Sequence, residues 1–292
     1  MISSRRNSLS PSARDAQLAG VSALSALISS ALFVLVVAFV LKESWPALTG
    51  VGPARFFLDP AWHPTEGLFG LTPMLAASLA ASIGATLLAA PLGIGCALFW
   101  RYYAPPAIAR LYRWAVILLS GMPSVVMGLW GLTVVVPLIA LVEPPGASLL
   151  AAILILTLMI APTVALTTEA ALAALPDAYW RGALALGLSR EGVIAHVVLP
   201  ATRASVASGV LLAAARALGE TMAVVMVSGN VVQTPSSLFD SVRTLTANVA
   251  LEMAYATGNH RASLFVSGLM LAALALAFAA TARSLVGARG HA

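Results

Sequence analysis

The chain has 292 residues, of which 60% are hydrophobic and only 9% are charged, and its formal net charge is +5. A soluble domain of this size carries about a quarter charged residues, so this composition excludes a water-exposed globular surface and predicts a polytopic membrane protein. The single cysteine, Cys96, lies inside an apolar run and excludes an intrachain disulfide.

In chain order, a basic, polar tail at 1–17 precedes an apolar segment that is too long for a signal-peptide core, so we expect an uncleaved first span. A helix needs about 20 apolar residues to cross a bilayer. Six segments meet this length, at 18–41, 71–99, 115–142, 148–168, 204–231 and 262–286. The predicted fold is an all-α bundle of six transmembrane helices.

The distribution of positive charge predicts the orientation of these spans. Eleven of the 16 Lys and Arg residues lie in the tails and loops on the side of the N-terminus, four lie on the opposite side, and Arg216 lies within a span. Cytoplasmic loops carry the excess of Lys and Arg, so both tails, 1–17 and 287–292, are predicted to be cytoplasmic. The loop 42–70 is then extracytoplasmic. The same distribution explains the positive net charge without nucleic-acid binding.

The predicted cytoplasmic loop 169–203 has an amphipathic helical pattern that Gly187 interrupts and Pro200 ends. Two short helices bent at Gly187 would expose one face to the cytoplasm. The alternative is a helix pair that lies flat on the lipid headgroups.

The spacing in this loop resembles the coupling loop of ABC importer permeases, which reads E-A-A, three residues, Gly, nine residues, I-x-L-P. The corresponding positions here are Arg181, Gly182, Ala183, Gly187, Leu199 and Pro200. Arg181 and Gly182 depart from the usual acidic residue and alanine. The resemblance implies a loop that inserts into a groove of an ATPase subunit, with Gly187 at the bend.

The sequence lacks a Walker motif, because Lys42, its one lysine, has no glycine-rich run before it. No catalytic set and no metal-ligand spacing are found, so we expect no enzyme activity, metal or cofactor in this chain. If ATP drives transport, a partner chain must bind ATP and Mg.

Three further stretches, 62–79, 120–132 and 215–253, resemble the phosphate importer permeases of the PstC type. "ARALGETMAVVMVSGN" followed by "PSSLFDSVRTLTANVALEM" is the most specific. The resemblance implies a type I importer (MetI-like) fold in a transmembrane domain at 71–286. It also implies a second permease subunit (PstA type), two ATP-binding subunits (PstB type), an extracytoplasmic phosphate-binding protein (PstS type) and the bacterial inner membrane.

Arg216 and Glu220 are the ionisable residues that stand out within a predicted span. Four residues apart on one helix, they are expected to lie on one face and to touch. A guanidinium matches the oxygens of phosphate, so Arg216 is predicted to contact the anion in transit, with Glu220 holding it in place and Thr221 adding a polar group. The alternative is a neutralised pair that only fixes helix packing.

Other polar residues have roles that the sequence leaves open. Arg243, Thr244 and Asn248 line an outer vestibule, contact the binding protein or satisfy the backbone of a re-entrant turn. Ser124 is expected to satisfy a carbonyl freed by Pro123 within a span, and the alternative is a kinked helix in which Ser124 lines the translocation path. Rival functions are a permease of the same fold for sulfate or molybdate, a membrane enzyme and a passive anchor.

Overall fold

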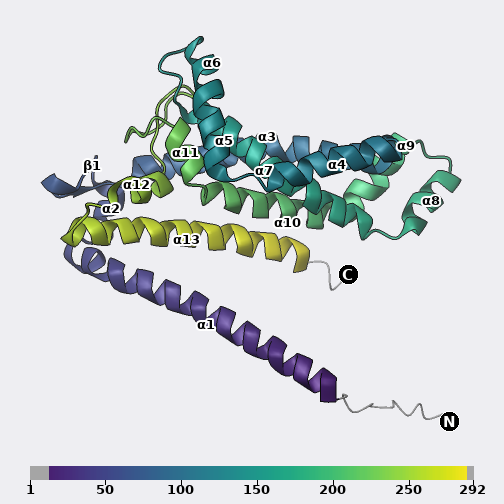
Figure 1. The fold of residues 1–292 in the computed structure, drawn as a ribbon, viewed down its shortest axis with the longest axis horizontal. Coiled ribbons are helices and arrows are strands. Elements are labelled where there is room, and N and C mark those ends of the chain that lie inside the picture. The colour runs from purple at the N-terminus through teal and green to yellow at the C-terminus, as the bar shows by residue number, and fades with distance from the viewer. Residues whose placement is uncertain (1–12, 288–292) are drawn as a thin grey trace.

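The computed structural model describes residues 13–287, which form an elongated bundle of helices (Figure 1). The tail residues 1–12 and 288–292, predicted to be cytoplasmic, lie outside the described part of the chain. Five helices are long and apolar enough to cross a membrane, and a bent helix pair makes a sixth candidate. The all-α membrane fold is therefore confirmed.

The long helices run along the length of the molecule, and the shortest of them, α4 (Pro106–Ser120), covers only part of it (Figure 1). They are α1 (Ala13–Gly50), α3 (Thr72–Leu98), α4 (Pro106–Ser120), α7 (Leu149–Ala173), α10 (Leu199–Leu218) and α13 (Gly258–Gly287). Helix α1 continues to Gly50, well beyond the predicted end at 41, and its extension buries Ala47 completely against Phe56 and Trp62. Tertiary packing thus lengthens this helix past its apolar run.

One end, here called the hairpin end, carries the short elements between α1 and α3 together with α12. These elements are α2 (Arg55–Leu58), β1 (Trp62–His63), the 3₁₀ turn η1 (Pro64–Glu66), β2 (Leu68–Phe69) and α12 (Leu245–Glu252). The two strands form a small antiparallel hairpin that pairs Trp62 with Phe69 and His63 with Leu68. The hairpin adds a minor β element to the predicted all-helical chain.

The opposite end, here called the loop end, carries α8 (Asp177–Ala185), α9 (Arg190–Val193) and the π-helical turn η2 (Phe99–Tyr103). The first turns of α1 and the last turns of α13 lie toward this same end (Figure 1). The predicted stop at Pro200 is wrong, because residues Arg190–Leu218 form one continuous helical span. A second π-helical turn, η4 (Ile194–Val198), widens the helix just before Pro200 and accommodates the missing N–H donor.

The predicted span at 115–142 is a bent helix pair and not one straight helix. Its residues form α4 and a second rod made of α5 (Ser124–Trp130), the π-helical turn η3 (Gly131–Val135) and α6 (Val136–Ala140). The two rods meet at an angle of 97°. Pro123 lies at this break in an extended conformation, because proline removes a helical donor and disfavours helix in the residue before it.

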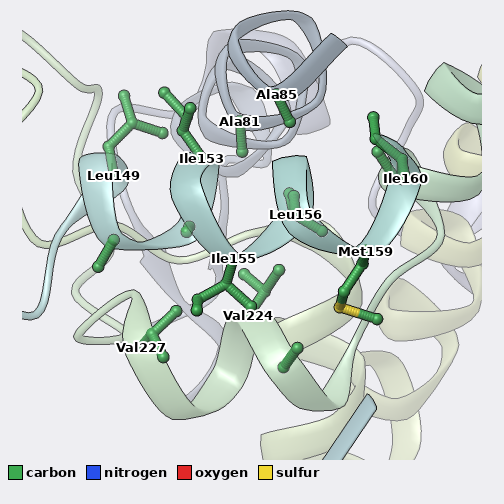
Figure 2. Close-up of a cluster of buried hydrophobic side chains, with 14 of the residues drawn as sticks. Ala81, Ala85, Leu149, Ile153, Ile155, Leu156, Met159, Ile160, Val224 and Val227 are labelled. Carbon is green, nitrogen blue, oxygen red and sulfur yellow. The ribbon is translucent and has the colours of Figure 1, made fainter. Parts of the chain in front are cut away.

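Helix α7 lies at the centre of the core. Figure 2 shows its side chains between α3, which contributes Ala81 and Ala85, and α11 (Met222–Val227), which contributes Val224 and Val227. Two-thirds of the most apolar part of α7 is buried, against none in α1. The α7 residues that pack against α3, α10 and α11 therefore hold in place the helices that carry the polar residues.

Two glycines on α3 differ in how closely they approach the neighbouring helix α7. A Cβ atom at Gly93 would lie 2.7 Å from Val164 Cβ and 2.9 Å from the Ala161 carbonyl oxygen, both on α7. A Cβ atom at Gly95 would have no neighbour within 4 Å. Close packing of α3 against α7 therefore requires a glycine at Gly93 and not at Gly95.

Gly93→Ala is therefore expected to lower the thermal stability of the purified protein, because overpacking a tight contact costs about 1–3 kcal/mol. Gly95→Ala is the matched control, since both substitutions bring the same gain in helix propensity of about 1 kcal/mol. Melting temperatures measured in one detergent should fall for the first variant and hold or rise for the second. Equal shifts would contradict the tight α3–α7 contact.

Candidate functional site

The predicted span at 204–231 is broken beside its charged residues. Helix α10 ends at Leu218 and α11 begins at Met222, so Glu220 lies in the connection and not on a helix. The Glu220 carboxylate accepts the N–H of Thr221 at 3.1 Å, and the Glu220 carbonyl accepts the hydroxyl of Thr246 at 3.1 Å. The break is thus tied to α12 of the hairpin end.

The expected pairing of Arg216 with Glu220 is wrong. No ion pair within residues 13–287 includes Arg216, and its Nη1 donates instead to Thr163 Oγ1 on α7 at 3.0 Å. The helix ends before Glu220, so the spacing of four residues no longer places the two side chains on one face. Thr163 follows Pro162 in the predicted fourth span, and no sequence pattern distinguishes its hydroxyl from the other threonines of that span.

Arg216 is nevertheless exposed on this chain, although Ala213, Ala214 and Ala217 around it are buried. A charge at membrane depth costs several kcal/mol unless it faces protein or a water-filled cavity. The side of α10 that carries Arg216 therefore requires a polar neighbour, a partner subunit or an aqueous path.

A second polar cluster lies at the hairpin end around Glu252. The Glu252 carboxylate accepts from Arg243 Nη1 at 2.6 Å and from Trp62 Nε1 at 2.9 Å, and its contact with His260 Nε2 is 2.8 Å. Arg243 also donates to the Asn230 carbonyl at 2.9 Å. The carboxylate therefore joins the hairpin, the start of α13 and the residues flanking α12, and sequence reasoning missed it because its partners come from distant segments.

The contacts of residues 243–248 bear on the three roles that the sequence leaves open for them. Arg243 donates to Asn248 Oδ1 at 3.2 Å, and it also donates to the Glu252 carboxylate and to the Asn230 carbonyl. Thr244 caps α12 by accepting the N–H of Ala247 at 3.3 Å, and Asn248 is fully buried. This geometry matches the backbone-satisfying turn, while a vestibule role for these residues stays a prediction.

Ser124 does not lie where it was expected. It is the first residue of α5 and follows Pro123 at the break, so Pro123 frees no carbonyl inside a helix. The proposed repair of a kinked helix by Ser124 is wrong for this reason.

The connection between α11 and α12 is held by Asp240. Its Oδ2 accepts the N–H groups of Ser236 at 2.7 Å and Ser237 at 2.8 Å. These donors favour the ionised form and lower the pKa of the Asp240 carboxyl. The loop contacts are therefore retained in mild acid and are lost only when the pH falls through this lowered pKa.

The predicted coupling loop is well defined at the loop end. Gly187 follows α8 with a φ of +84°, and the N–H of Leu188 donates to the Ala183 carbonyl at 3.3 Å. Arg181 is exposed and lies 3.6 Å from Asp177, and Gly182 beside it is exposed. Ala183 is buried, whereas Leu199 and Pro200 begin α10. The bend at Gly187 thus presents the outer face of α8 away from the bundle.

Residues 89–288 match the family of binding-protein-dependent transport system inner membrane components. The chain belongs to this family. It is a transport subunit and not an enzyme, it crosses the inner membrane several times, and it functions with a partner permease, an ATPase and a periplasmic binding protein. In the described residues no group of three or more His, Cys, Asp or Glu is arranged to hold a metal ion.

Relatives cover most of the chain. A Bacillus subtilis protein named "Probable ABC transporter permease protein YqgH" is 36% identical over 88% of this chain and 84% of its own length. The phosphate transport system permease protein PstC of Mesorhizobium japonicum is 33% identical over 83% of this chain and 81% of its own length. In an inward-facing structure of the MetNI methionine ABC transporter, a chain 19% identical to this one aligns with a TM-score of 0.57. That alignment covers 78% of this chain and 99% of the MetNI chain, and it confirms the importer permease fold.

Proposed function

We propose that this chain is the permease subunit of an ATP-driven phosphate importer and forms the translocation path together with a second permease subunit. The observation that carries the proposal is Arg216, an exposed guanidinium at the end of a membrane-spanning helix with no carboxylate partner in the described chain. An arginine fork binds the oxygens of a phosphate bidentately, and intramembrane charges usually serve a transport path.

The related PstC proteins support phosphate as the cargo, since several of them are 31–33% identical to this chain over most of its length. A permease for sulfate or molybdate would meet the same oxyanion chemistry and is the alternative. In the phosphate system the partners are a PstA-type permease, two PstB-type ATP-binding subunits and a PstS-type binding protein. ATP and Mg belong to the ATP-binding subunits.

The bend at Gly187 and the exposed face of α8 support a docking role for 169–203 on the ATP-binding subunits. The docking residues are Arg181, Gly182, Ala183, Gly187, Leu199 and Pro200. We place the loop end in the cytoplasm and the hairpin end outside, as the excess of positive charge near the loop end predicts. Both tails are then cytoplasmic.

Purification of the chain with its membrane partners, followed by reconstitution in vesicles, tests this function. ATP-dependent uptake of radioactive phosphate is expected only when the binding protein and both permeases are present. Uptake of sulfate or molybdate in place of phosphate would reject the cargo, and purification without any ATP-binding subunit would reject the importer assignment.

A further inference from the structure

The hydrogen bond between Arg216 and Thr163 has features that packing alone does not require. A guanidinium carries five N–H donors, and the described residues accept one of them, at Thr163 Oγ1. A hydroxyl is a neutral acceptor, so it orients the guanidinium without cancelling its charge. A carboxylate in the same place would compete with any incoming anion.

The Thr163 hydroxyl also retains a donor. Its oxygen accepts from Arg216, and within the described chain no acceptor is found for its own O–H. Thr157 and Thr167 on the same helix differ, because each donates to a carbonyl one turn earlier, at 2.7 Å and 2.8 Å. Thr163 therefore departs from the usual behaviour of threonine in a membrane helix.

Close packing of α7 against α10 fixes the position of Thr163 relative to Arg216. A Cβ atom at Gly209 would lie 2.3 Å from Thr167 Oγ1, so only glycine permits this approach of α10 to α7. On α10, Ala213 and Ala217 continue the buried small-residue face toward Arg216. The two helices thus hold the threonine and the arginine in register.

We propose that Thr163 orients the Arg216 guanidinium and, together with it, forms the binding site for the anion in transit. It accepts from Nη1, turns the remaining donors of the guanidinium toward the path, and offers its own O–H to an oxygen of the same tetrahedral oxyanion. A site made of one neutral hydroxyl and one singly charged guanidinium binds such an anion weakly enough to release it, as conduction requires. This inference rests on the proposed function of Arg216.

The test compares Thr163→Val, Thr163→Ser and Thr167→Val in the reconstituted importer. Thr163→Val keeps the shape but removes the hydroxyl, and we expect the maximum rate of phosphate uptake to fall about tenfold, as for a hydrogen bond to a charged group. Half-saturation by phosphate should not change, because the binding protein captures the anion. Thr163→Ser restores the hydroxyl and should restore the rate, and Thr167→Val should resemble the unmodified chain.

A normal rate in Thr163→Val overturns the inference, as does an equal loss in Thr163→Val and Thr163→Ser. If Thr163→Val does not assemble with its partners, Thr163→Ala is read by the same criteria. Arg216→Gln, measured beside them, separates the two hypotheses. Loss of uptake in Arg216→Gln with a normal Thr163→Val rejects the role of Thr163 alone, whereas normal uptake in Arg216→Gln rejects the proposed anion contact itself.

Discussion

An Arg216→Gln variant is expected to assemble with its partner subunits and to lose phosphate uptake. The substitution keeps a polar side chain, although a shorter one, and removes the charge and the fork of donors. A hydrogen bond between charged groups is worth about 1.5–3 kcal/mol, and each 1.36 kcal/mol changes a rate about tenfold, so the rate should fall at least about tenfold. The measurement is ATP-dependent uptake of radioactive phosphate by reconstituted vesicles.

Arg110→Gln is the matched control, because Arg110 is an exposed arginine on α4 that lies outside the predicted coupling loop. It should leave uptake close to that of the unmodified chain. Equal uptake by the two variants would remove Arg216 from the translocation path, and equal loss would point to a general need for positive charge and not to Arg216.

A Gly187→Val variant is expected to uncouple ATP hydrolysis from transport or to release the ATP-binding subunits. Gly187 has a φ of +84°, and a β-branched residue is a genuine outlier there. The left-handed conformation costs an L residue about 1–2 kcal/mol, so the end of α8 should shift out of its docking position. The measurement is the ATPase activity of the purified complex with and without loaded binding protein.

Gly187→Asn is the control at the same position. Asparagine adds comparable bulk but adopts the left-handed conformation more readily, and no atom lies within 4 Å of a Cβ placed at this position. Coupling should therefore be retained in Gly187→Asn. If valine and asparagine fail equally, bulk at the docking surface matters and backbone conformation does not.

Much of the fold could be predicted because bilayer thickness imposes the length of apolar segments. The predicted helix boundaries are wrong where backbone hydrogen bonding determines whether a helix ends at a proline. Pro123 ends a helix and turns the chain by 97°, whereas Pro200 does neither. Pro200 differs because the π-helical turn at Ile194–Val198 accommodates its missing N–H donor, and no local sequence pattern predicts this turn.

The candidate site was predicted in part. Arg216 was selected because a charge in an apolar segment is conspicuous in any sequence, but its partner was assigned by spacing along an assumed helix. The actual partner, Thr163, is 53 residues away and is brought near by the α7–α10 contact. Glu252 was missed for the same reason, since Trp62, Arg243 and His260 reach it from separate segments.

The continuity of Arg190–Leu218 has a mechanical consequence. This span of 29 residues is about 43 Å long at 1.5 Å per residue, and it begins three residues after the bend at Gly187 and ends two residues after Arg216. If the loop end docks on the ATP-binding subunits as proposed, a rod of this length would act as a lever, and a small tilt at Arg190 would move the end near Arg216 by several ångströms.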